Sequence, residues 1–296
     1  MKLFNYISLY AKFIACMVKK DTVTNEEYGK SYDEVASTYE KWVGIMGKHV
    51  KPLIKTEFFS KEARVIDLAC GTGFISRELL SQGYEGELIG IDISEMMIKK
   101  CHEMKSDRVN FIQEDAIKYL EDMSHKGEHV DGIYLGWALP YLEQKRLIEV
   151  AYKVLKPGGY FITISNCKGT LVGVEKTILE VMMNNIHMVS KPMEAKVRLP
   201  KDEKHLGRWF KKRGFKSIHI GEGEEWVCYK SPEKLYQWLR DTGVLAGVDK
   251  VFYDVREAED LLIEEFRKSH KTSRGFEVNH KFVYGIFRKE GGISCE

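Results

Sequence analysis

The chain has 296 residues, of which 44% are hydrophobic and 30% are charged. This composition is typical of a soluble globular protein that buries a sizeable core. Its 46 basic and 44 acidic residues leave a net charge of +2, which gives no electrostatic footprint for nucleic acid. The six cysteines are scattered and form no Cys-x-x-Cys pair, so the sequence predicts no zinc site of the usual spacing and a reducing, cytoplasmic environment.

Residues 3–18 predict an amphipathic helix, because apolar side chains recur along them at helical spacing. Lys12 interrupts the apolar run and no stretch of about 20 apolar residues exists, so neither a membrane span nor a signal peptide is expected. Two interpretations stay open. The apolar face packs on the protein or on a partner chain, as in a homodimer, or it makes peripheral membrane contact helped by Lys2, Lys12, Lys19 and Lys20. Residues 21–29 are polar and turn-prone and are predicted to be a linker.

A strand, a glycine turn and a helix are predicted between residues 64 and 82. Residues 65–68 form a short apolar run that is typical of a buried strand. Gly71 and Gly73 then allow a tight turn where backbone can approach a ligand. Apolar residues from Phe74 onward fall at helical spacing. This order is the first half of a βαβ nucleotide-binding unit.

The residues of this turn favour a cationic nucleoside without phosphates. Ser76 stands where a dinucleotide fingerprint needs its third glycine, and the turn has no phosphate-loop lysine. Asp67 lies at the end of the first strand, where a carboxylate repels pyrophosphate and suits a cation. Asp92 ends the next strand, where an acid is placed to bind a ribose diol. The sequence therefore predicts a site for S-adenosylmethionine.

Several segments in this order resemble the motifs of the class I S-adenosylmethionine-dependent methyltransferases, and in particular their type 11 branch with its quinone C-methyltransferases. Residues 67–73 resemble motif I, although Ala69 replaces the glycine that many members have. Residues 87–94 resemble motif II, 113–116 the segment with the adenine-side acid, and 155–161 the "LKPGG" segment. Residues 32–42 resemble the flap that precedes the core in that branch.

The resemblance assigns roles around the cofactor. Asp67 is expected to hold the methionine end and Asp92 the ribose hydroxyls. Asp115 and Ala116 are expected to meet the adenine, with Met97 stacked on it. The predicted cofactor-binding residues are Tyr32, Asp67, Ala69, Gly71, Gly73, Asp92, Ile93, Met97, Asp115, Ala116 and Trp137.

The acceptor side is less determined. Residues 136–141 lack the Asn/Asp-Pro-Pro-Tyr/Phe tetrad of DNA amino-methyltransferases, so base methylation is not expected. Trp137 and Asn166 stand where catechol-type enzymes need magnesium-binding carboxylates, so no metal is expected. Candidate substrate-lining residues, each with core packing as its alternative, are Tyr39, Trp137, Tyr141, Asn166, Trp209 and Trp226. Candidate general bases, needed only for some acceptors, are Tyr141, His187, His205 and His280.

The alternation of strands and helices predicts an α/β, doubly wound, mostly parallel seven-stranded sheet of the Rossmann-like type. N-terminal helices and the flap are expected at 1–59, the cofactor-binding core at 60–165, and the last strands at 166–296, as one integrated domain. About sixty residues, 221–279, are predicted between the last two strands, and insertions of this length usually act as lids.

These features predict a methyltransferase that uses S-adenosylmethionine to modify a small organic molecule by in-line displacement in a dry cleft. Attack by oxygen, nitrogen or carbon stays open. The flap favours a quinone or lipid-like C-methyltransferase. Residues 239–244 loosely resemble malonyl-acyl-carrier-protein O-methyltransferases and favour a carboxyl acceptor. A non-catalytic cofactor-binding protein is the remaining alternative.

Overall fold

The computed structural model describes residues 2–192 and 199–290. The chain divides into two compact units. The unit that we call the helical unit comprises Met1–Lys41, Gly169–Val197 and Glu224–His280. The sheet unit comprises Trp42–Lys168, Arg198–Gly223 and Lys281–Glu296. The division at residues 59 and 165 that the sequence suggested stays a prediction.

The strands form one seven-stranded sheet in the order β3-β2-β1-β4-β5-β7-β6. Strands β1 to β5 pair in parallel, and β7 runs antiparallel to β5. This confirms the predicted doubly wound, mostly parallel sheet, whose strand order reverses between β1 and β4. The bounds are β1 Arg64–Leu68, β2 Glu87–Asp92, β3 Val109–Gln113, β4 Val130–Gly136, β5 Leu155–Asn166, β6 Phe215–Tyr229 and β7 Phe276–Lys289.

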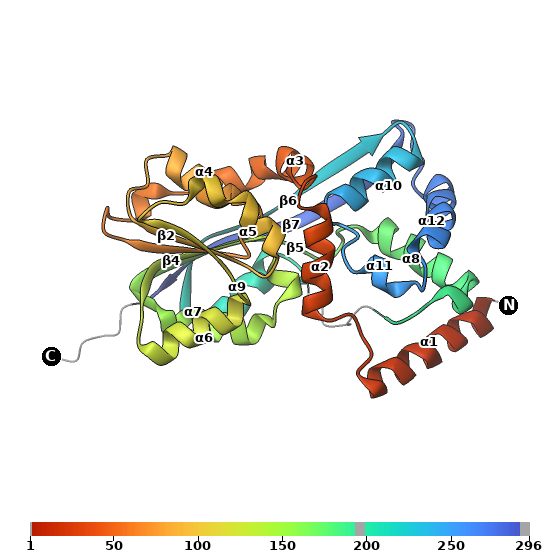
Figure 1. The fold of residues 1–296 in the computed structure, drawn as a ribbon, viewed down its shortest axis with the longest axis horizontal. Coiled ribbons are helices and arrows are strands. Elements are labelled where there is room, and N and C mark those ends of the chain that lie inside the picture. Colours follow the sequence, from red (N-terminus) through yellow and green to blue (C-terminus); the bar gives the residue numbers. More distant parts are fainter. Residues whose placement is uncertain (1, 193–198, 291–296) are drawn as a thin grey trace. The chain divides into compact units, whose positions relative to one another are not determined.

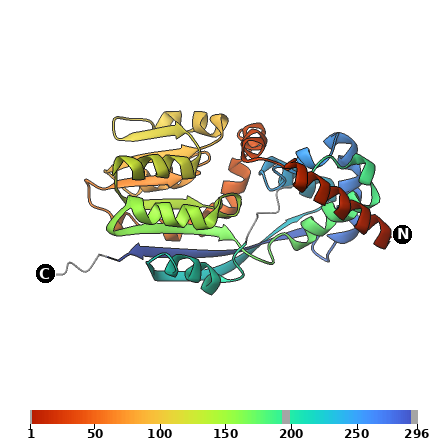
Figure 2. The same cartoon turned by 90° about the horizontal axis from the view of Figure 1, so that it is seen from below.

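Helices cover both faces of this sheet. Figures 1 and 2 show α6 (Ala116–Lys126), α7 (Gln144–Val154) and α9 (Glu203–Lys211) on one face. The opposite face carries α4 (Phe74–Ser81) and α3 (Glu40–Val50), with α5 (Glu95–Lys100) contacting β2 and β3. The α7 helix forms here because Leu147, Ile148, Ala151 and Val154 recur at helical spacing and are buried in the main core.

The last two strands are longer than the sequence indicated, so the insertion between them covers only residues 230–275. The insertion was expected to begin at residue 221, yet Gly221 and Gly223 lie inside β6. A Cβ atom at Gly221 would come within 2.3 Å of the Tyr284 hydroxyl, and one at Gly223 within 2.6 Å of the Phe282 ring. These glycines make room for aromatic rings of β7 and do not break the strand.

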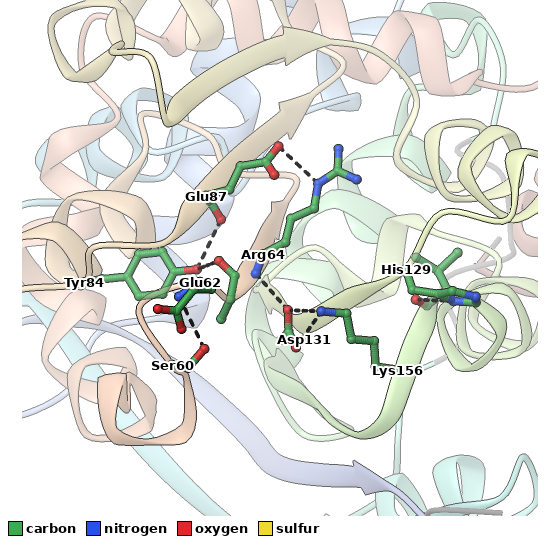
Figure 3. A network of polar contacts seen from close by, with 10 residues as sticks. Ser60, Glu62, Arg64, Tyr84, Glu87, His129, Asp131 and Lys156 are labelled. Carbon is green, nitrogen blue, oxygen red and sulfur yellow. Dashed lines mark hydrogen bonds and ion pairs between the residues drawn. The ribbon is translucent and has the colours of Figure 1, made fainter.

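Polar side chains tie the N-terminal ends of the strands together (Figure 3). The Asp131 carboxylate accepts the backbone N–H of Arg64 at 2.8 Å and pairs with Lys156 at 2.8 Å. The Arg64 side chain pairs with Glu87 at 3.1 Å and with Glu128 at 2.9 Å. These contacts connect β1, β2, β4 and β5 at the N-terminal edge of the sheet. The cofactor motifs lie at the opposite, C-terminal edge.

The helical unit holds α1 (Lys2–Lys19), α2 (Asn25–Val35), α8 (Val172–Asn184), α10 (Pro232–Asp241), α11 (Val248–Val251) and α12 (Val255–Ser269). The predicted linker at 21–29 is wrong from Asn25 onward, because Thr24 and Glu27 form a capping box that starts α2. Within the described ranges 2–192 and 199–290, no helix has the length and apolar character that crossing a bilayer requires.

Candidate cofactor and acceptor site

Asp67 lies near the C-terminal end of β1 and is 1% exposed. Its Oδ2 accepts hydrogen bonds from the backbone N–H and the hydroxyl of Ser76, at 3.1 and 2.7 Å. Its Oδ1 is buried and has no hydrogen-bond partner among the described residues. Burial raises the pKa of Asp67 to about 7, although the Ser76 hydrogen bonds act to lower it. A buried oxygen of this kind is costly unless a ligand completes it, so Asp67 fits a cationic or hydrogen-bond-donating group.

The turn after β1 has a left-handed backbone at Ala69, Gly71 and Gly73, with φ values of 50°, 55° and 77°. A Cβ atom at Gly73 would lie 2.4 Å from the Met104 side chain. Ala69 adopts a conformation that favours glycine, which explains why a glycine often stands there in the family that the sequence resembles. The turn brings bare backbone to the C-terminal edge of the sheet, as a nucleotide site requires.

Asp92 joins this turn to the end of β2. Its Oδ2 accepts the N–H of Gly71 at 2.8 Å, and its Oδ1 accepts the N–H of Ser94 at 2.9 Å. The two hydrogen bonds fix the carboxylate in place at the end of β2, where the sequence predicts contact with the ribose hydroxyls. Ile93 is 37% exposed beside it, whereas Met97 is 1% exposed. The burial of Met97 disfavours its predicted stacking on the adenine, and Ile93 is the apolar side chain that this strand end offers.

Asp115 caps the helix that follows β3. Its Oδ1 accepts the backbone N–H groups of Ile117 and Lys118, both at 2.9 Å. Both of these bonds go to one oxygen, which leaves Oδ2 able to accept from an adenine amine. Ala116 is buried at the first position of α6. Capping and cofactor contact are compatible here because they use different oxygens.

An aromatic cluster lies at the same edge of the sheet unit. Trp137 follows β4 with a φ of 63°, and its N–H donates to the Ile164 carbonyl at 2.7 Å. Its ring lies 5.5 Å from that of Trp42 and 5.5 Å from that of Phe282, in edge-to-face contacts. The His49 ring lies 4.7 Å from Phe282. A bulky residue with a left-handed backbone is rare outside functional sites, so this cluster is the candidate acceptor wall.

Unsatisfied buried oxygens recur along this edge. Asn166 ends β5 directly opposite Phe282. Its Oδ1, like Asp67 Oδ1 and the hydroxyl oxygen of Thr72, is buried without a hydrogen-bond partner in the part of the chain that the structure describes. Buried oxygens without a hydrogen-bond partner are uncommon in native proteins, and they are usually paired with a polar ligand or a water molecule. Sequence reasoning found Asn166 and Trp137 but missed Thr72, His49 and Phe282.

The predicted residues Tyr32, Tyr39, Trp226, His187 and His280 belong to the helical unit. Tyr32 contacts Tyr39 edge to face at 6.2 Å, and Trp226 and His187 are exposed. His280 is 0% exposed, and burial lowers its pKa to about 4 while Glu225 acts to raise it. A buried, neutral imidazole is ill suited to take a proton from a substrate in solution.

The other predicted bases and walls lie in the sheet unit. His205 receives the backbone N–H of Lys201 at 3.0 Å and the indole N–H of Trp209 at 3.2 Å. Burial is the largest cause that lowers the pKa of His205. A neutral imidazole accepts at one nitrogen only, so both donors compete for it. Trp209 also packs against the main core, which favours a structural role for both residues. Tyr141 is half-buried at the end of the short helix η4 (Leu139–Tyr141).

The expectation of no metal site also stays a prediction. Across residues 2–192 and 199–290, no group of three or more His, Cys, Asp or Glu side chains is placed to hold a metal ion.

Cys70, which lies inside the glycine turn, is buried, and its thiol has Cys101 as a neighbour that helps to raise its pKa. A buried thiol with a raised pKa is a poor nucleophile.

A family model described as "Methyltransferase domain" matches residues 59–243. Demethylmenaquinone methyltransferase from Desulfitobacterium hafniense is 29% identical over 119 residues, which cover 38% of this chain. The chain spans about half of that relative's length, 46%. Malonyl-[acyl-carrier protein] O-methyltransferase 2 from Ilyobacter polytropus is 22% identical over 279 residues, which cover 90% of this chain and 99% of the relative.

Solved structures show the same fold. A SAM-dependent methyltransferase from Anabaena variabilis superimposes with a TM-score of 0.52 at 13% identity, covering 89% of this chain and 94% of that one. The resemblance to class I methyltransferases that the sequence motifs carried is therefore confirmed for family and fold. The roles of individual residues rest on the geometry described above.

Proposed function

This chain belongs to the methyltransferase-domain family, and from that premise we propose that it transfers the methyl group of S-adenosylmethionine to a small organic acceptor. The observation that carries the proposal is the buried Asp67 Oδ1, which has no hydrogen-bond partner in the described part of the chain, beside a glycine turn that Asp92 holds in place. This arrangement suits a cationic adenosine derivative, whereas a carboxylate at this place would repel a pyrophosphate.

Each part of the cofactor has a fitting group in the chain. Asp67 Oδ1 would accept from the methionine amine, and the carboxylate of Asp92 from the ribose hydroxyls. The turn at Gly71 would lie against the sugar, and Asp115 Oδ2 would accept from the adenine amine. When bound, the cofactor supplies an electrophilic methyl group on a sulfonium, and the chain mainly orients the reactants and excludes water.

The aromatic cluster supports an acceptor with a flat apolar body. Trp42, Trp137 and Phe282 would surround such a body and keep water out, since aromatic rings bury large apolar areas. Asn166 Oδ1 would accept a hydrogen bond from an acceptor hydroxyl. His49, which touches Phe282, is the candidate to take the proton that the acceptor loses. A phenolic or quinol ring combines these properties.

A carboxyl acceptor is the second candidate, and a different observation favours it. The relative named malonyl-[acyl-carrier protein] O-methyltransferase aligns along 90% of this chain, so the alignment includes residues of the helical unit. The demethylmenaquinone methyltransferase from Desulfitobacterium hafniense is more similar per residue but aligns over 38% of the chain, and the one from Lactococcus lactis aligns over 69% at 25% identity. A carboxylate needs no general base, because it is already a competent nucleophile at neutral pH.

Transfer of a labelled methyl group separates these candidates. The purified protein is given labelled cofactor with a demethylated naphthoquinol in one reaction and a malonyl thioester of acyl-carrier protein in another. We expect label in the quinol. Label in the thioester alone would establish the carboxyl reading. Cofactor binding without transfer to either acceptor, or to any compound of a metabolite extract, would support the non-catalytic alternative.

Asp92→Ala tests the cofactor site itself. We expect the affinity for S-adenosylmethionine to fall by about 1–3 kcal/mol, because the substitution removes a hydrogen-bond acceptor and frees Gly71. Titration calorimetry measures the change. Asp131→Asn is the matched control, since Asp131 also accepts a backbone N–H but lies at the opposite edge of the sheet. Equal affinities in wild type and Asp92→Ala would remove Asp92 from the site.

A further inference from the structure

One face of α1 is apolar and exposed. Phe4, Ile7, Ile14 and Val18 are between 45% and 79% exposed. Their spacing of three, four and seven residues places them along one side of a helix, with the exposed Ala11 between them. Tyr6, Tyr10 and Met17 widen this stripe and are also exposed. A continuous apolar surface of this kind on a soluble unit marks an interaction site.

The other side of α1 is already packed within the helical unit. Leu9 and Cys16 are buried, and the helix contacts α8 and the short helix η5 (Ile186–Met188). The Lys12 ammonium donates to the Val189 carbonyl and lies 5.2 Å from the centre of the Tyr253 ring. The charge that interrupted the apolar pattern in the sequence therefore faces the unit, and the outward stripe carries no charge.

The charged residues of α1 itself are all lysines. Residues 1–20 contain no aspartate or glutamate, and the exposed Lys19 and Lys20 end the helix, while Lys2 begins it. In a two-fold antiparallel pair of such helices, the C-terminal lysines of one copy would meet the N-terminal lysine of the other. Like charges repel, and residues 1–20 supply no acid to compensate. The pattern instead complements a negatively charged surface.

We propose that α1 lies flat on an anionic lipid surface, with Phe4, Ile7, Ile14 and Val18 among the acyl chains and Lys19 and Lys20 at the phosphates. The 18-residue helix would extend over about 27 Å of the surface, at about 1.5 Å per residue. Tyr6 and Tyr10 stack at 6.2 Å, and tyrosine suits the boundary between headgroups and acyl chains. The inference is independent of the proposed methyl transfer.

Vesicle co-sedimentation of the full chain tests this. We expect binding to vesicles of phosphatidylcholine mixed with phosphatidylglycerol, weaker binding at high salt, and little binding to pure phosphatidylcholine. The double variant Ile7→Glu/Ile14→Glu is expected to bind at least roughly tenfold more weakly, because it places two charges in the stripe. Val172→Glu is the matched control, since Val172 is 56% exposed on α8, and it should bind like the wild type.

A second variant tests the contribution of the lysines to vesicle binding. Lys19→Gln/Lys20→Gln is expected to weaken binding to the mixed vesicles roughly tenfold. All variants must keep the wild-type melting temperature and cofactor affinity, which shows that folding and the cofactor site are intact. Equal vesicle binding by wild type and Ile7→Glu/Ile14→Glu would overturn the proposal. So would a wild-type dimer that binds no vesicles and becomes monomeric in that variant, because the stripe would then bind a second copy.

Discussion

At the scale of single residues, the protonation of Asp67 decides what the site can hold. The carboxyl is almost fully buried, and among the described residues its charge is stabilised by the hydrogen bonds from Ser76. Burial therefore favours the neutral form of this side chain. A bound ammonium group would reverse this preference, because an opposite charge in contact favours the carboxylate. Binding of the cofactor and ionisation of Asp67 are then linked.

This linkage predicts opposite pH effects on binding and on stability. Cofactor affinity should rise between about pH 6 and pH 8, as the carboxyl with a pKa of about 7 ionises. The free protein should lose stability as the pH rises from about 4 through about 7, since its folded state holds a proton that the unfolded chain has released. Calorimetry and denaturant unfolding measure the two trends. Asp67→Asn should flatten both, and a variant with the wild-type slope would contradict the assignment.

At the scale of elements, the two ends of the strands have different tasks. The C-terminal ends carry a left-handed backbone at Trp137 and buried oxygens that have no hydrogen-bond partner within residues 2–192 and 199–290. The N-terminal ends carry the paired charges around Asp131, which connect four neighbouring strands. The paired polar groups at the N-terminal edge can hold the sheet together. The C-terminal edge can then keep buried oxygens that a ligand would hydrogen-bond.

Asp131→Asn should therefore lower stability without affecting the cofactor. The amide can still accept the Arg64 N–H, but it loses the charge that pairs with Lys156. We expect the free energy of unfolding to fall by about 1 kcal/mol, because the pair is partly exposed. Urea denaturation checks the value. A fall of cofactor affinity as large as that of Asp92→Ala would show that the two edges are not independent.

Local sequence patterns predicted the helices and strands well, but they did not predict contacts between residues that are distant in the chain. The apolar run at residues 65–68, the glycines and the acid at the end of β2 were readable because each signal spans a few neighbouring residues. The contact between His49 and Phe282 joins positions more than two hundred residues apart in the chain, so no local pattern contains it. The length of β6 was underestimated because Gly221 and Gly223 make room for the rings of Tyr284 and Phe282. These rings belong to another strand, so a local pattern does not contain them.

At the scale of the whole molecule, one compact unit is made from chain segments that are distant in sequence. The N-terminal helices join the segment after β5 and the insertion between β6 and β7. Within this unit, Thr38 donates to the Asp241 carbonyl at 2.7 Å, and Ser31 to the Asp249 carboxylate at 3.0 Å. The flap motif is thus bound to the insertion, so we expect the two to act together.

Deletion of residues 1–20 should leave cofactor binding intact. The α1 helix contacts α8 and η5, whereas Asp67, Gly71 and Asp92 belong to the sheet unit. We expect a somewhat lower melting temperature, because Leu9 and Cys16 no longer cover their neighbours, and an unchanged calorimetric affinity for S-adenosylmethionine. Loss of cofactor binding in a folded deletion variant would place α1 in the cofactor site.

The hydrogen bond from Gly71 to Asp92 has a consequence for the kinetics of recognition. Because this bond joins two groups of the chain itself, the loop is held in one conformation by its own residues. Conformational freedom is given up when the polypeptide folds, and association involves little further ordering. We therefore expect the nucleoside to bind with a large association rate constant and in a single kinetic phase. A chain whose loop had to order on binding would associate with the same molecule more slowly.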